Sequence, residues 1–182
     1  MNLADIRQLV RKGETETVEF KTKANHPEKI VKEIVAFANT KGGRLLIGVT
    51  DNGALTGLSS AEEELYTLEN AISRYCRPEI KYEYQILPVS GKKSIIIYTI
   101  FESKSKPHYT LLNQQNNHRQ GYIRVADRSV QASKEMREIL RRERKQAAVK
   151  FTYGEKEKVL MKYLEKHEFI TLKNFASLAG IR

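Results

Sequence analysis

The fold is decided by residues 13–58, which begin G-E-T-E-T-V-E-F-K (13–21) and end A-F-A-N-T-K-G-G-R-L-L-I-G-V-T-D-N-G-A-L-T-G-L (36–58). Alternating residues over Thr17–Thr22 predict a short strand, and the apolar run Arg44–Thr50 predicts a second, central strand. Between them Pro27 suits the first turn of a helix, whose second half is apolar nearly all round. We therefore expect a buried helix between two strands, followed by a turn at Asp51-Asn52-Gly53.

Further elements are expected on both sides of this unit. Amphipathic patterns predict helices at residues 2–12, 61–75 and 133–145. Strands are predicted at 81–88 and 93–101, which form a hairpin around Ser90-Gly91, and at 107–112 and 121–125, which pair around the polar loop 113–120. The expected fold class is α+β, a mixed β-sheet flanked by helices, in a domain of residues 1–150.

Residues 151–182 are predicted to form a separate helical segment. Helices are expected over Glu155–Lys166 and Thr171–Ala179, and Gly180 follows where a turn is needed. This pattern resembles the opening of a helix-turn-helix or winged helix, and Arg182 stands where a recognition helix would begin. The interpretations left open are a truncated DNA-binding unit and a simple helical hairpin.

Composition excludes several classes of protein. No apolar run approaches the roughly 18 residues of a membrane span, and the N-terminus lacks the apolar run of a signal peptide. The single cysteine, Cys76, rules out an internal disulfide framework and favours a reducing compartment. The histidines lack zinc-ligand spacing. We expect a cytoplasmic protein without a membrane partner.

The net charge of +10 is concentrated in one segment. Residues 101–150 contain twelve Lys and Arg against five Asp and Glu, whereas residues 61–100 carry a slight acidic excess. A concentrated basic surface attracts phosphate backbones by counterion release. The sequence therefore predicts a nucleic-acid partner, the alternative being an ordinary solvated surface.

Basic side chains within this segment fall into a strand and a helix. Alternation over Gly121–Val125 places an aromatic and a basic residue on one face, which we interpret as exposed and able to stack a base and contact phosphate. The helix repeats arginine at positions i, i+4 and i+7 and so carries them on one face, although Glu135, Glu138 and Glu143 partly neutralise it. The predicted nucleic-acid-binding residues are Tyr122, Arg124, Arg128, Arg137, Arg141 and Arg144. Lys104, Lys106, His108 and Arg119 extend this surface if their loops lie nearby.

An acidic cluster is the second candidate site. Glu19 and Lys21 share strand parity, and Asp51 closes the neighbouring strand, so these side chains are expected on one side of the sheet. Joined by Glu14, such carboxylates would hold Mg²⁺ or Mn²⁺ for phosphodiester cleavage, with Lys21 facing the phosphate. The alternative is a structural Glu19–Lys21 ion pair beside a turn.

The ordered motifs of residues 10–145 resemble the AlbA-2 domain of Schlafen proteins and of many bacterial regulators. The resemblance includes the two ends of residues 13–58, then Lys106-Pro107-His108-Tyr109, Gly121–Val125 and the helix after Ser133. It implies a DNA-binding domain of a transcriptional regulator. In Schlafen nucleases the acidic triad lies in the matching segments, which implies Glu14, Glu19 and Asp51 here, with Thr50 departing from the family's first aspartate.

The resemblance also implies a homodimer, because Schlafen cores pair two such lobes. The leading interpretation is a DNA-binding module that needs no cofactor. The alternative is a Mg²⁺- or Mn²⁺-dependent endoribonuclease. A third interpretation is a nucleotide-sensing or protein-interaction module that uses Gly42-Gly43, although the exit from a helix into a strand explains these glycines better.

Overall fold

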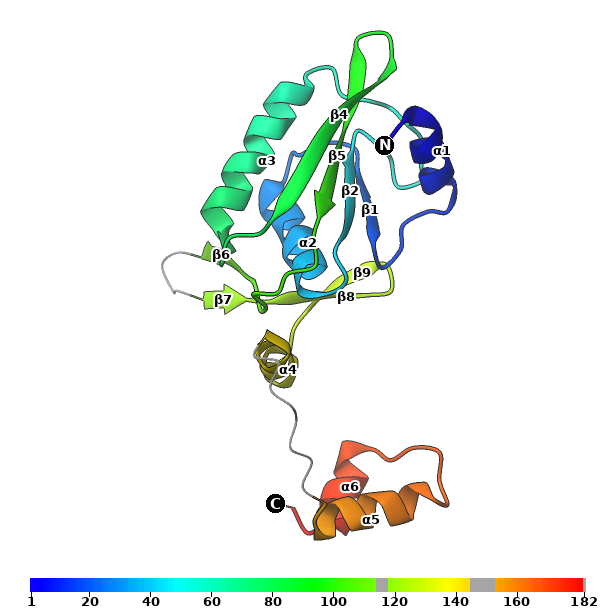
Figure 1. Cartoon of the computed structure of the whole chain (residues 1–182), viewed down its shortest axis with the longest axis vertical. Helices are drawn as coiled ribbons and strands as arrows, with labels where there is room; N and C mark the ends of the chain where they lie inside the picture. Colours follow the sequence, from blue (N-terminus) through cyan, green and yellow to red (C-terminus); the bar gives the residue numbers. More distant parts are fainter. Residues whose placement is uncertain (114–117, 145–152, 182) are drawn as a thin grey trace. The chain divides into compact units, whose positions relative to one another are not determined.

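The computed structural model of the 182-residue chain describes residues 1–113, 118–144 and 153–181. The chain divides into two compact units, Met1–Gln146 and Ala147–Arg182, and each is described by itself (Figure 1). The predicted domain boundary at residue 150 stays a prediction, since residues 145–152 lie outside the described ranges.

The first unit alternates helices and strands. Its helices are α1 (Leu3–Arg11), α2 (Pro27–Asn39), α3 (Ala61–Tyr75) and α4 (Lys134–Arg144). Four of its strands form the central sheet: β1 (Val18–Lys21), β2 (Gly43–Ile47), β4 (Tyr82–Ser90) and β5 (Lys93–Ile100). The others are β3 (Cys76–Arg77), β6 (Tyr109–Asn113), β7 (His118–Gln120), β8 (Tyr122–Val125) and β9 (Arg128–Gln131).

A four-stranded sheet forms the centre of this unit, with strand order β1-β2-β5-β4. Strands β1 and β2 are parallel and joined through α2, whereas β5 is antiparallel to both of its neighbours. A parallel pair requires such a crossover, because a tight turn cannot return the chain in the same direction. The predicted α+β class with a mixed sheet flanked by helices is confirmed (Figure 1).

Helices cover both faces of the sheet. Leu45 and Ile47 of β2 pack into a cluster with α2 and α3, while Leu46 packs with Phe20 and α1 on the opposite face. Successive side chains of a strand point to opposite faces, so a strand covered on both sides is apolar throughout. This double burial explains the continuous apolar run in residues 44–50.

The predicted pairing of residues 107–112 with 121–125 is wrong. Strand β6 pairs with β7, and β8 pairs with β9 in a separate two-stranded ribbon. The turn between β8 and β9 uses Ala126 at φ 55°, without the Asn-Gly or Asp-Gly signal that marks such turns in a sequence. Residues 114–117 of the predicted polar loop lie outside the described residues.

The diglycine after α2 is required by packing. A Cβ atom at Gly42 would lie 2.6 Å from the Ile100 carbonyl oxygen, and one at Gly43 would lie 2.4 Å from the Phe37 ring. Gly42 also has φ 72°, a left-handed conformation that glycine adopts without strain. Both glycines therefore let the chain turn closely from α2 into β2.

The second unit contains α5 (Glu155–Leu164) and α6 (Leu172–Leu178). The Thr171 hydroxyl accepts a hydrogen bond from the Asn174 backbone N–H and begins α6. Neither helix has a buried residue. The helix-turn-helix interpretation of this segment stays a prediction. Across the described part of the chain, no helix is long and apolar enough to cross a membrane.

Candidate nucleic-acid interface

The β8–β9 ribbon turns its predicted binding face inward. Tyr122 and Arg124 lie against α2 and are 8% and 3% exposed, whereas Val125 on the opposite face is 53% exposed. The alternation was predicted correctly, but the expectation that Tyr122 and Arg124 form the solvent-facing side is wrong. The ribbon packs on α2, and there Arg124 forms ion pairs with Glu19 and Glu33. The alternation of residues along a strand cannot predict these partners.

Arg124 is the centre of a buried ion-pair network. Its Nη1 lies 3.0 Å from Glu19 Oε2 on β1 and 2.7 Å from Glu33 Oε2 on α2. Its Nη2 donates to the Thr15 carbonyl at 2.8 Å, and its guanidinium lies 4.8 Å from the centre of the Phe37 ring. A buried charge is tolerated when it is paired and hydrogen-bonded in this way. Arg124 therefore joins three elements of the core.

The acidic candidates are placed in different surroundings. Glu19 is 6% exposed and shared between Lys21 and Arg124, as the structural ion-pair alternative expects in part. The Glu14 carboxylate accepts the Phe20 backbone N–H at 2.8 Å, while Asp51 is exposed in the turn after β2. Within the described ranges, which include all three acids, no three His, Cys, Asp or Glu side chains are arranged to hold a metal ion.

The charges of Glu19 and Asp51 nevertheless affect the pKa of Glu14. Burial raises the pKa of its carboxyl above the ordinary 4.5, the Phe20 N–H opposes that shift, and the charges of Glu19 and Asp51 raise the pKa further. The chain reverses between Thr15 and Val18, which brings Glu14 back along β1. The structure thus brings Glu19 and Lys21 into contact and places Glu14 within electrostatic reach of Glu19 and Asp51.

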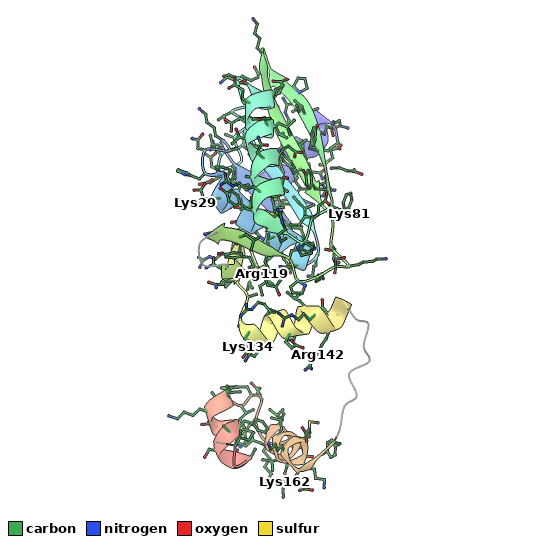
Figure 2. The ribbon with its side chains drawn as sticks, turned by 90° about the vertical axis from the view of Figure 1, so that its left-hand side faces the viewer. Lys29, Lys81, Arg119, Lys134, Arg142 and Lys162 are labelled. Atoms are coloured by element: carbon green, nitrogen blue, oxygen red, sulfur yellow. The ribbon has the colours of Figure 1, made fainter. Side chains whose placement is uncertain are left out.

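Helix α4 carries the exposed part of the basic segment. Leu140 is 4% exposed and anchors the helix, while Arg141 and Arg142 have side chains 54% and 61% exposed. Figure 2 shows Lys134 and Arg142 at opposite ends of α4, with Arg119 on β7 beside it. The helix therefore presents cations along its outer surface.

The arginines of α4 form weak ion pairs and hydrogen bonds with groups that are open to solvent. Arg141 lies 3.1 Å from Glu138 and donates to the Tyr109 hydroxyl at 3.4 Å, and Arg142 lies 3.8 Å from the same glutamate. Arg137 is half-buried and donates from Nε to the Ser133 carbonyl. Exposed ion pairs of this kind contribute about 0–1 kcal/mol, so these arginines can exchange partners at little cost.

Arg128, Arg119 and Lys104 are exposed as expected, but Arg144 has a side chain outside the described residues. Lys106 does not extend the surface, because it is 7% exposed and paired with Glu102 at 2.7 Å and with Glu143 of α4 at 3.5 Å. Through Glu143, Lys106 instead links α4 to the rest of the first unit.

His108 is also buried, with Nδ1 2.9 Å from the Pro78 carbonyl and Nε2 2.6 Å from Ser103 Oγ. Burial lowers the pKa of this histidine below the ordinary 6.5, and the hydrogen bond to the Pro78 carbonyl opposes that shift. Asn39 exchanges two hydrogen bonds with the His108 backbone and donates to the Tyr122 carbonyl. Sequence reasoning missed the bridging roles of Asn39 and Glu33. The one signal for Asn39 was a polar residue at the end of the apolar second half of α2, and Glu33, which lies beside other charged residues of the first half, gave none.

Comparison with known proteins identifies the class of domain. The family model described as Schlafen, AlbA_2 matches residues 14–133, from Glu14 to the residue before α4. The chain therefore belongs to the Schlafen AlbA_2 family, and the resemblance inferred from its motifs is confirmed.

A solved structure has a similar fold. It is the solution NMR structure of the N-terminal domain of an ATP-dependent DNA helicase RecG-related protein from Nitrosomonas europaea. The two chains are 21% identical with a TM-score of 0.50, and the match covers 62% of this chain and 82% of the other. No curated protein matches this sequence significantly.

Proposed function

We propose that this chain is a nucleic-acid-binding domain that holds DNA phosphates on the outer surface of α4. The observation that carries the proposal is the set of exposed cations on a helix anchored by Leu140 and by the Lys106–Glu143 pair. Family membership and the helicase-related structural neighbour support a nucleic-acid partner.

On α4 the contacts are assigned to Arg137 and Arg141, with Arg144 included by its position on the same helix, and one further contact is assigned to exposed Arg128 on β9. Tyr122 and Arg124 are assigned no contact with nucleic acid, because both are buried against α2. Contacts of arginine with phosphate position a protein on nucleic acid without reading its sequence, so we expect low sequence specificity. A role in transcription regulation rests on the resemblance of residues 151–182 to the opening of a helix-turn-helix.

A double substitution tests the assignment. Arg137→Ala/Arg141→Ala should lower the affinity for duplex DNA roughly tenfold to a hundredfold near physiological salt, because two phosphate contacts are lost. Arg7→Ala/Arg11→Ala on α1 is the matched control, since it removes two exposed arginines of another helix. Fluorescence anisotropy with labelled duplex DNA and single-stranded RNA measures both variants. Equal affinities of the two double variants would contradict the proposal.

The alternative, a metal-dependent endoribonuclease, rests on the match of Glu14, Glu19 and Asp51 to the acidic segments of Schlafen nucleases, although within the described ranges no three such side chains are arranged to hold a metal ion. Incubation with tRNA and Mn²⁺ tests it against Asp51→Asn and Glu14→Gln, because Glu19→Ala would also deprive Arg124 of a partner. The DNA-binding proposal expects no cleavage, or equal residual cleavage by all three proteins. Cleavage by the wild type alone would establish the nuclease.

A further inference from the structure

The two edges of the central sheet differ in how their outward backbone groups are hydrogen-bonded. At the β1 edge, the Glu14 side chain accepts the outward backbone N–H of Phe20. The opposite edge is β4, the nine-residue strand drawn in green in Figure 1, and among the described residues no strand pairs with its outer side. Unpaired edges attract further strands, and proteins usually protect them.

The alternation of hydrogen bonds between β4 and β5 shows which backbone groups of β4 do not bond to β5. Phe101 N–H donates to the Lys81 carbonyl at 3.3 Å, and the register pairs Tyr82 with Ile100. Bonded and non-bonded pairs alternate along an antiparallel ladder. The backbone N–H and C=O groups of Tyr82, Tyr84 and Ile86 therefore point away from β5.

The same three residues place their side chains on one face of the sheet. The rings of Tyr82 and Tyr84 lie 5.8 and 6.0 Å from the ring of buried Tyr98, and Ile86 packs on the same core cluster. Tyr84 is 50% exposed, and nearby Phe101 is 44% exposed. The open edge is thus flanked by an apolar, aromatic strip.

We propose that β4 pairs antiparallel with β4 of a second copy of this chain, about a two-fold axis at Tyr84. Tyr84 then lies opposite Tyr84, and Tyr82 of each copy lies opposite Ile86 of the other, with their free backbone groups bonded. On the other face Glu83 lies opposite Gln85, an uncharged residue whose amide donates to the Met1 carbonyl at 3.0 Å and accepts from the Met1 amino group at 2.9 Å. The two sheets become one eight-stranded sheet.

Neighbouring registers are less favourable. An axis at Glu83 would place two Glu83 carboxylates directly opposite each other, and facing like charges destabilise a pair. An axis at Gln85 would place Tyr82 opposite Pro88, which has no N–H to donate. The surface also suits a protein strand better than nucleic acid, because Glu79 and Glu83 flank Lys81 there.

Cysteine cross-linking tests the register. Opposed residues of a non-bonded antiparallel pair have Cα atoms about 4.5 Å apart, within the range of a disulfide. Under mild oxidation a mixture of Glu83→Cys and Gln85→Cys should form the mixed dimer in several-fold excess over either protein alone. Buried Cys76 stays unreactive. Equal cross-linking in the mixture and in the separate proteins would overturn the proposed register.

Sedimentation velocity without nucleic acid tests the pairing itself and is independent of the proposed DNA binding. The wild type should sediment as a concentration-dependent dimer, and Tyr84→Lys, which places two lysines opposite each other, as a monomer. Tyr66→Lys is the matched control, since Tyr66 lies 72% exposed on α3. A wild type that is monomeric throughout, or a Tyr84→Lys protein that still dimerises, would overturn the proposal.

Discussion

Arg124 and the arginines of α4 belong to the same basic segment, yet the structure uses them differently. Arg124 is 3% exposed and joins β1, α2 and β8 through Glu19, Glu33 and the Thr15 carbonyl. Arg141 is exposed and pairs with its helix neighbour Glu138 and with the Tyr109 hydroxyl. A local excess of positive charge therefore combines a structural arginine with cations that remain available to a partner.

The largest effect is expected from removing Arg124. Arg124→Ala leaves Glu19 and Glu33 without their shared cation, and breaking a buried pair costs about 3–5 kcal/mol. Arg128→Ala, on the adjacent strand but exposed, should change the free energy of unfolding by less than about 0.5 kcal/mol. Urea denaturation followed by circular dichroism compares the two. Similar unfolding midpoints would erase the distinction between the buried and the exposed arginines.

A smaller effect is expected at Lys106, which links the core to α4. Lys106→Met keeps most of the buried stem but removes the charge between Glu102 and Glu143. Both glutamates are about half exposed, so water can hydrate them when the lysine charge is removed. We therefore expect the free energy of unfolding to fall by about 1–2 kcal/mol. Hydrogen exchange should accelerate chiefly in α4, whereas exchange in β5 should stay unchanged. Uniform acceleration throughout the first unit would show that the pair does not act on α4 in particular.

The smallest effect concerns the acid at the β1 edge. The folded-state pKa of Glu14 is raised, so its contribution to stability is present below the ordinary value of 4.5 and is lost as pH rises through the folded pKa. Glu14→Gln keeps an acceptor for the Phe20 N–H without the charge. The variant should therefore be at least as stable as the wild type at pH 7, and this advantage should shrink in thermal melts below pH 4.5. If the stability of Glu14→Gln relative to the wild type instead increased as the pH falls, the pKa of Glu14 in the folded protein would be lowered rather than raised.

The central fold could be predicted because its signals are local. Pro27, the apolar helix after it and the run Arg44–Thr50 define a strand–helix–strand unit, and each element forms where expected. The β8–β9 ribbon could not be predicted as well, because Ala126 and Asp127 form a turn without the usual glycine.

The candidate site was less predictable for another reason. Strand alternation placed Tyr122 and Arg124 on one face, but it does not say which face is buried. That choice depends on Glu19 and Glu33, which lie 105 and 91 residues from Arg124 in the chain. On α4, helix periodicity predicts a buried stripe of Met136, Ile139 and Leu140 and an exposed face that includes Arg137 and Arg141. Leu140 is buried and Arg141 exposed as predicted, but Ile139 is 48% exposed and Arg137 is half-buried, so that part of the prediction is wrong.

The salt dependence of DNA binding tests the central claim most directly. If exposed arginines of the basic segment hold phosphates, a plot of log affinity against log salt concentration should be linear, with a slope of roughly −3 to −4 for about four contacts. For Arg137→Ala/Arg141→Ala the slope should be less steep by about 2. A flat salt response, or no binding to DNA or RNA at low salt, would contradict the account.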